Sequence, residues 1–81
     1  MTILLFGVTK DIIGKSTLSF SDFTRDKLKT VHDLKVYLKK EYPDLKKLSS
    51  LAIAVNNSYA EDVLQLQHTD EIALIPPVSG G

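Results

Sequence analysis

The chain has 81 residues, of which 43% are hydrophobic, ten are basic and ten are acidic, and it contains no cysteine. This length and composition predict one small folded domain, and the balanced charge, without a dense basic stripe, argues against a nucleic-acid partner. The lack of cysteine excludes a thiol nucleophile, a disulfide and a thiolate metal site. The lack of a long apolar run or a signal peptide predicts no membrane partner and, by default, a cytoplasmic location.

Two strands are predicted in the first third of the chain. Residues 2–8 are mostly apolar at consecutive positions, which indicates a strand with hydrophobic side chains on both faces. Residues 9–15 interrupt this pattern, and Gly14 marks a turn. Residues 16–23 alternate roughly between apolar and polar, so we expect a second strand that forms a hairpin with the first. A polar connection over 24–29 follows.

A single main helix is predicted to begin after Thr30. The Thr30 hydroxyl can accept a hydrogen bond from the N–H of Asp33, which is typical of a helix N-cap. Apolar residues then recur at spacings of three and four, which predicts one buried stripe. The stripe consists of Val31, Leu34, Leu38 and Tyr42, and Tyr37 widens it. Pro43 disfavours helical geometry in the residue before it and ends the helix.

After the helix, we expect a connecting segment and two more strands. Three leucines at positions 45, 48 and 51 are expected to tuck this segment under the core. Residues 51–55 are apolar and predict a buried strand. Residues 56–58 predict a turn, because Asn tolerates positive φ. Tyr59 and Ala60 are expected to begin a short return strand.

The last part of the domain is predicted to be a mixed segment, a turn and a final strand. The mixed segment covers 61–67, and its expected packing residues are Val63, Leu64 and Leu66. Residues 68–70 form the turn, and 71–75 form a buried strand. This order predicts an α+β fold in which one helix covers one face of a mixed sheet of four to five strands. Such an arrangement is a β-grasp, or ubiquitin-like, fold, which we assign to residues 1–77, with a flexible tail at 78–81.

The end of the chain has a pattern of its own. Pro76 and Pro77 have no N–H to give to a sheet, so the strand stops there and the chain leaves in a stiff, extended form. Gly80 and Gly81 lack Cβ atoms, so this backbone can pass where a side chain would clash. We therefore predict a narrow arm that inserts the Gly81 carboxylate into another protein's active site. The alternative is a frayed tail.

The first and last strands also predict a docking surface. Both strands are apolar on both parities, although a single helix covers only one face of the sheet. If Ile3 and Leu5 face the helix, then Leu4 and Phe6 point away from it, and we expect the same of Ile75. An exposed apolar patch beside the arm is suited to binding a partner. The alternatives are a loop that covers this face, or self-association.

Other kinds of site have little support in the sequence. His32 and His68 are far apart, and neither has a second ligand at a metal-binding spacing. No nucleophile elbow is present, and the glycines are too scattered for a phosphate-binding loop. We therefore expect no metal site.

Along essentially its whole length, the chain resembles the small, sulfur-carrier subunit of molybdopterin synthase. The matching pieces are Leu5-Phe6-Gly7, Thr30-Val31 through Leu38, Tyr42-Pro43, Ala54-Val55-Asn56 and, above all, Asp70 through Gly81. Two positions depart from the family pattern. Thr69 stands where the family often has Gly, and Lys10-Asp11 stands where it has an Arg-Glu pair.

The resemblance implies a mechanism. An enzyme similar to the ubiquitin-activating class would use ATP to adenylate the Gly81 carboxylate, and sulfur would then replace one oxygen to give a thiocarboxylate. The carrier would dock on the large synthase subunit and donate sulfur to cyclic pyranopterin monophosphate. The chain would bind no cofactor and would not be an enzyme by itself. The implied tail-threading residues are Val78, Ser79 and Gly80, and the implied partner-binding residues are Leu4, Phe6, Ile75, Pro76 and Pro77.

Three alternatives remain open at this point. A thiamine-type sulfur carrier would have the same Gly-Gly tail. A ubiquitin-like modifier would be joined through Gly81 to lysines of other proteins. A plain interaction domain would have an inert tail.

Overall fold

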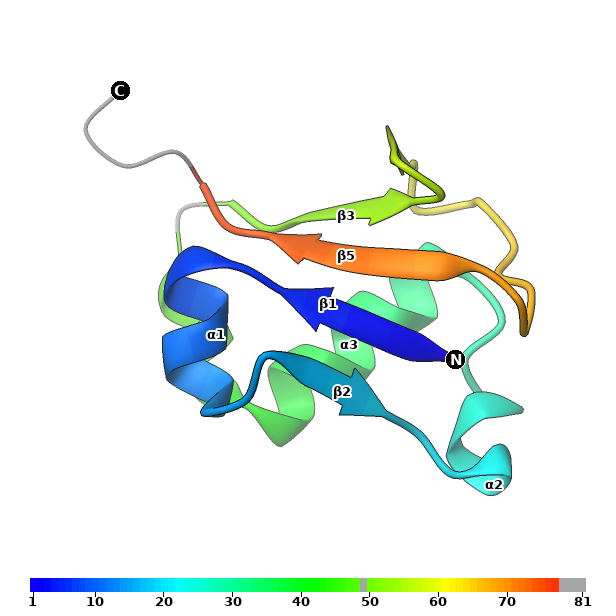
Figure 1. Cartoon of the computed structure of the whole chain (residues 1–81), viewed down its shortest axis with the longest axis horizontal. Helices are drawn as coiled ribbons and strands as arrows, with labels where there is room; N and C mark the ends of the chain where they lie inside the picture. Colours follow the sequence, from blue (N-terminus) through cyan, green and yellow to red (C-terminus); the bar gives the residue numbers. More distant parts are fainter. Residues whose placement is uncertain (49, 78–81) are drawn as a thin grey trace.

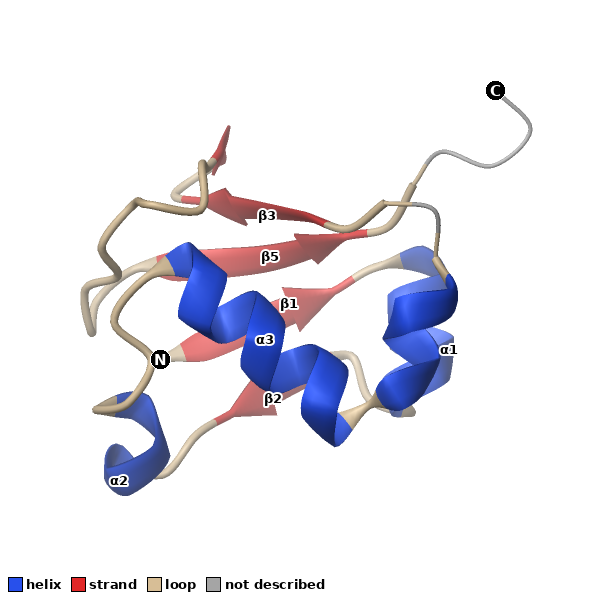
Figure 2. Cartoon of the chain, turned by 180° about the vertical axis from the view of Figure 1, so that it is seen from behind, coloured by secondary structure: helices blue, strands red, loops and turns tan. Residues whose placement is uncertain are grey.

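A five-stranded sheet with helices on one face forms the body of the protein (Figures 1 and 2). The computed structural model describes residues 1–48 and 50–77. The strands are β1 (Thr2–Leu5), β2 (Thr17–Ser19), β3 (Ala52–Val55), β4 (Ser58–Tyr59) and β5 (Glu71–Ile75). The helices are α1 (Gly7–Ile13), α2 (Asp22–Arg25), α3 (Val31–Glu41) and the 3-10 helix η1 (Pro43–Lys47). The predicted α+β, β-grasp architecture is therefore confirmed.

The sheet has the order β2-β1-β5-β3-β4, which places the last strand at its centre. Strands β1 and β5 are parallel, and the other neighbours are antiparallel. The predicted return of the last strand beside the first is therefore correct. Every second residue of the three central strands points toward α3 and is buried, as alternation along a strand requires. These core residues are Ile3, Leu5, Ile53, Val55, Ile72 and Leu74.

Helix α3 forms where the sequence predicts it. The Thr30 hydroxyl accepts from the N–H of Asp33, and the Asp33 carboxylate accepts from the N–H of Thr30, each at 3.2 Å. This capping box satisfies backbone donors that the first turn leaves unpaired. The stripe is buried at Val31, Leu34 and Leu38, and the half-buried Tyr42 forms the C-cap before η1.

The segment between β4 and β5 is fastened to α3 through its backbone. The carbonyl of Leu64 accepts from the N–H of Val31, and that of Asp62 accepts from the N–H of His32, both at 3.0 Å. Lys35 Nζ also lies 2.8 Å from Asp62 Oδ1, and this hydrogen bond lowers the pKa of the Asp62 carboxyl below its ordinary value.

The side chains of this segment correct one of the predictions. Val63 and Leu64 were expected to pack inward, but they are 78% and 42% exposed. With the carbonyls of Asp62 and Leu64 turned toward the helix, the segment packs through its backbone at these positions. Leu66 is buried, as predicted.

The first predicted strand is too long. It ends at Leu5 rather than at Val8, because Gly7 has φ +55°, a left-handed conformation that no strand continues through. The residues that follow form helix α1, although the sequence indicated only an interruption and a turn at Gly14. The antiparallel pairing of the first two strands is correct, but a helix joins them instead of a tight turn.

The second predicted strand is also too long. It covers only Thr17–Ser19 instead of 16–23, and the short helix α2 begins soon after it. The hydroxyl of Ser21 accepts from the N–H of Thr24 at 3.3 Å and caps this helix. The N-cap signal of a serine followed by an aspartate therefore outweighed the rough alternation.

The remaining elements differ from the predictions only at their ends. Strand β3 begins at Ala52 rather than Leu51, and β4 is Ser58–Tyr59 rather than Tyr59 and Ala60. Asn56 and Asn57 make the predicted turn with φ values of 52° and 69°. Among the three connecting leucines, Leu45 is buried, and Leu48 and Leu51 are half-buried.

Replacement of Leu34 by Ala tests the packing of α3. We expect a loss of about 2–5 kcal/mol in the free energy of unfolding, because Leu34 is fully buried between α3 and the sheet. Val36→Ala on the same helix is the matched control, because Val36 is 53% exposed and its change should cost about 0.5 kcal/mol or less. Urea unfolding of both variants measures the difference. Equal losses would mean that α3 is not held by this stripe.

Candidate docking face and C-terminal arm

Phe6 is held at the junction of β1 and α1 by the buried hydroxyl of Thr9. The Thr9 hydroxyl accepts from the N–H of Phe6 at 3.2 Å and donates to the Phe6 carbonyl. Thr9 is completely buried, although the Phe6 side chain is 48% exposed. The fold therefore fixes the backbone of Phe6 and leaves its ring at the surface. This role of Thr9 could not be predicted from the sequence, where its one sign is the place of Thr9 three residues after Phe6.

The sheet face opposite α3, called here the outer face, carries a hollow of about 320 Å³. Its lining residues are Leu4, Phe6, Ala54, Asn57, Tyr59, Glu71, Ala73 and Ile75. Ala54 and Ala73 lie directly opposite each other on β3 and β5, so small side chains form the middle of this face. Larger apolar side chains surround them, and among the lining residues that the structure describes, Glu71 is the charged one.

The structure brings together three of the predicted partner-binding residues. Leu4, Phe6 and Ile75 line the same hollow, while Ile3, Leu5 and Leu74 are buried beneath α3. The prediction that they point away from the helix is therefore confirmed. That a partner docks on them stays a prediction.

The two prolines follow at the end of β5. Pro76 and Pro77 are half-buried, and they continue the chain from the edge of the hollow, directly after Ile75. The predicted tail-threading residues Val78, Ser79 and Gly80 and the reactive Gly81 lie outside the described residues. The domain boundary predicted after residue 77 also stays a prediction.

Sequence reasoning missed the contribution of β4 and β3 to this face. Tyr59 is 76% exposed and pairs with Ala54, so its ring borders the hollow from the far side of β3. The signal was the turn at 56–58, because a return strand places Tyr59 opposite Ala54.

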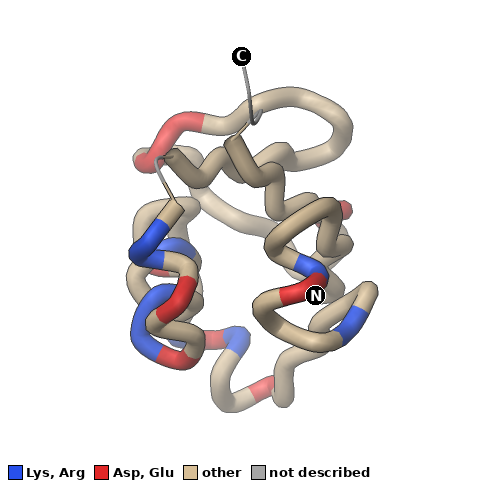
Figure 3. Tube along the Cα trace, turned by 90° about the vertical axis from the view of Figure 1, so that its left-hand side faces the viewer, with Lys and Arg blue, Asp and Glu red and all other residues tan. Residues whose placement is uncertain are grey.

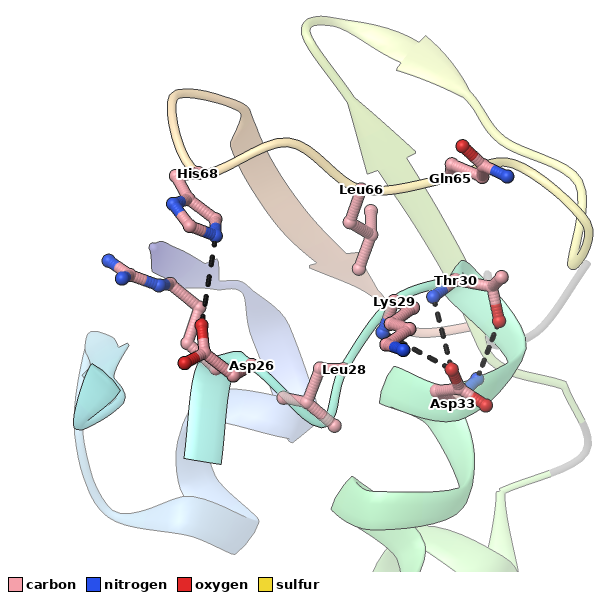
Figure 4. A pocket seen from close by; sticks show the side chains of 9 residues that line it. Asp26, Leu28, Lys29, Thr30, Asp33, Gln65, Leu66 and His68 are labelled. Carbon is pink, nitrogen blue, oxygen red and sulfur yellow. Dashed lines mark hydrogen bonds and ion pairs between the residues drawn. The ribbon is translucent and has the colours of Figure 1, made fainter. Parts of the chain in front are cut away.

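A second hollow, of about 520 Å³, lies at the other end of the molecule from the exit of β5 (Figures 1 and 4). Several of its polar groups make contacts within the chain, although the buried Nε of Arg25 has no hydrogen-bond partner among the described residues. The Asp33 carboxylate accepts from the N–H groups of Lys29 and Thr30, each at 3.2 Å. His68 Nε2 lies 3.9 Å from Asp26 Oδ1. This hollow is therefore a junction that caps α3, and we assign no chemistry to it.

Charges of both signs are interspersed along the chain (Figure 3). His32 lies beside Asp62, with 3.8 Å between His32 Nδ1 and Asp62 Oδ2.

In residues 1–48 and 50–77, no group of three potential metal ligands comes together. Within the same residues, no helix has the length and apolar character to cross a bilayer.

Comparisons with known proteins extend over almost the whole chain. A sequence model described as the ThiS family matches residues 3–81. The molybdopterin synthase sulfur carrier subunit of Dictyostelium discoideum is 39% identical over 82 residues, covering 98% of this chain and 93% of that protein.

Solved structures share the fold. SAMP1 from Haloferax volcanii, a small archaeal modifier protein, superposes with a TM-score of 0.75 at 26% identity, covering 99% of this chain and 97% of that one. A chain in the complex of subunits 1 and 2 of the molybdopterin-converting factor from Helicobacter pylori has a TM-score of 0.63 at 23% identity. That match covers 99% of this chain and 96% of that one.

Replacement of Thr9 by Val tests the anchoring of Phe6. The change keeps the shape of the side chain and removes both hydrogen bonds that the Thr9 hydroxyl makes with Phe6, so we expect a loss of about 1–3 kcal/mol in stability. The amide of Phe6 should also exchange with solvent faster, because its acceptor is gone. Thr9→Ser keeps the hydroxyl and should retain slow exchange. Slow exchange in Thr9→Val would contradict the anchoring role.

Proposed function

Because the chain belongs to the ThiS family, and within it to the molybdopterin synthase sulfur carrier subunits, we propose that the Gly81 carboxylate is the group that carries sulfur. Its role as a sulfur carrier in molybdenum cofactor biosynthesis follows from the family. The observation that carries the proposal is structural: the chain leaves the central strand at Pro76, beside an apolar hollow, and continues into Gly80 and Gly81.

The proposed chemistry begins with activation of a poor acyl donor. A carboxylate cannot expel oxide, so an adenylating enzyme joins the Gly81 carboxylate oxygen to the α-phosphate of ATP and releases pyrophosphate. Hydrosulfide then attacks the acyl carbon and expels AMP, and loss of the sulfur proton leaves a thiocarboxylate. In the large synthase subunit, the thiocarboxylate sulfur attacks a side-chain carbon of cyclic pyranopterin monophosphate and displaces an oxygen substituent from that carbon, and two such transfers supply the two sulfurs of the dithiolene. Hydrolysis of the resulting acyl–sulfur bond leaves the sulfur on the pterin and returns the Gly81 carboxylate.

The carrier's own contribution is binding and presentation. The outer face would seat on the large subunit through Phe6 and Ile75, and the two prolines would direct the chain into the active site. Gly80 and Gly81 would allow that passage, because they carry no side chains. The resemblance to a subunit in the Helicobacter pylori complex supports this assembly. Acid–base groups would come from the partner enzymes, so the chain is not an enzyme by itself.

A protein-modifier role is the second candidate. It is supported by the similarity to SAMP1, a small archaeal modifier protein. The same activated Gly81 carboxyl would then be passed to a lysine amine instead of sulfur. Proteins carrying this chain in isopeptide linkage would distinguish the modifier from a dedicated carrier.

Deletion of Gly81 tests the proposed carrier group. We expect the shortened protein to lose dithiolene formation when it is assayed with the large subunit, the adenylating enzyme, ATP and a sulfur source. The folded domain should melt as the full chain does, because the core ends at β5. Intact-mass measurement of the wild-type protein should show one oxygen exchanged for sulfur. Full activity of the shortened protein would contradict the proposal.

The double change Phe6→Ser, Ile75→Ser tests the docking face. Association with the large subunit should weaken by about 2 kcal/mol or more, because both side chains line the outer hollow. The matched control is Phe23→Ser, Val36→Ser, which removes an aromatic and an aliphatic side chain that are 72% and 53% exposed on the helices. Titration calorimetry measures binding, and thermal melting checks the fold. Equal binding of the two variants would place the docking surface elsewhere.

A further inference from the structure

Gly7 and Pro76 meet where the first and last strands leave the sheet. Gly7 opens α1 with φ +55°, and a Cβ atom added to it would lie 3.1 Å from Cγ of Pro76. This distance is shorter than ordinary van der Waals contact, so a side chain at position 7 would displace the proline ring by a few tenths of an ångström. Figures 1 and 2 show the start of α1 and the end of β5 at the same end of the molecule.

The topology explains why these two residues meet. Strands β1 and β5 are parallel neighbours with Leu5 opposite Leu74, so both chains leave the sheet on the same side. The chain from β1 turns at once into α1 and is held there by the hydrogen bonds between Thr9 and Phe6. Gly7 is therefore fixed by the fold. Pro76 has a fixed φ and follows the last strand residue, so its ring transmits the contact to the backbone that follows.

We propose that Gly7 is a positioning residue that sets the direction in which the C-terminal arm leaves the sheet. Without a side chain at position 7, Pro76 packs close to the α1 backbone, and the arm starts from one defined position beside the outer face. The consequence for sulfur transfer rests on the proposed carrier function, whereas the contact itself does not. A docked carrier with a displaced Pro76 would bind its partner but deliver its terminus to the wrong place.

A second glycine in this chain distinguishes two reasons why position 7 requires a glycine: its positive φ and its contact with Pro76. Gly14 also has a positive φ, of +81°, but nothing lies within 4 Å of a Cβ added to it. Strain of the backbone alone would affect both positions, and displacement of Pro76 would affect only one. Asn tolerates positive φ better than other side chains, and in this protein Asn56 adopts φ 52°, close to that of Gly7. An Asn therefore suits position 7 in its backbone but not in its contact.

The test compares Gly7→Asn with Gly14→Asn in the full chain. In the wild-type protein, NMR should show a nuclear Overhauser effect between the α-protons of Gly7 and the γ-protons of Pro76. In Gly7→Asn we expect shifted resonances for Pro76 and Pro77, and in Gly14→Asn no change there. In the synthase reaction, Gly7→Asn should lower kcat about tenfold with an unchanged KM for the carrier, because docking is intact and presentation is not.

A third variant closes the test. Pro76→Ala removes the ring from the other side of the contact, and Gly7→Asn should cause no further loss of kcat in that background. If Gly7→Asn fails to fold, Pro76→Ala alone should lower kcat with a wild-type melting temperature. Equal resonances and equal kcat in the two Asn variants would overturn the proposal, as would a raised KM with unchanged kcat. If the Gly81 deletion remains active, the carrier function fails, and the Pro76 resonances still decide the role of Gly7.

Discussion

The parallel pairing of β1 with β5 is the constraint on which the rest of the structure depends. It joins residues 2–5 to residues 71–74 and places the last strand between the first and the third. Because the two strands run in the same direction, their C-terminal ends lie at the same edge of the sheet. Gly7, just after β1, and Pro76, just after β5, therefore lie near each other without any local sequence signal linking them.

The two faces of the sheet differ in the size of their side chains, and one face forms the core while the other is exposed. The inward residues are large and aliphatic and pack against α3. On the outer face, the small side chains of Ala54 and Ala73 leave a hollow at the centre of the sheet. Large side chains at those two positions would fill the hollow that Phe6, Tyr59 and Ile75 surround. A shallow apolar recess beside a stiff exit suits a surface that binds a partner and then releases it.

Much of this arrangement could be predicted from the sequence, because strand alternation and helix capping are local. Alternation predicts that Ile3 and Leu4 lie on opposite faces of the sheet. The spacing of Thr30 and Asp33 predicts that α3 begins directly after Thr30. Helix α1 could not be predicted in this way, since the apolar run continues through Val8 and only Gly7 signals the break. Val63 and Leu64 were predicted wrongly because their segment is fixed by carbonyl groups, which leave no trace in a hydrophobic pattern. The hollow required strand register, which alternation does not provide.

The central place of β5 has a consequence for how the molecule comes apart. Without β5, the sheet would fall into two separate pairs, β1 with β2 and β3 with β4, which share no backbone pairing. Two-stranded pieces of this kind are marginally stable in water. Among the described residues, the two halves of the sheet are thus paired through β5, the strand that leads into the arm, and this favours cooperative unfolding. The start of the arm is therefore held in place for as long as the domain is folded, because it follows the central strand, and it is released only when the domain unfolds.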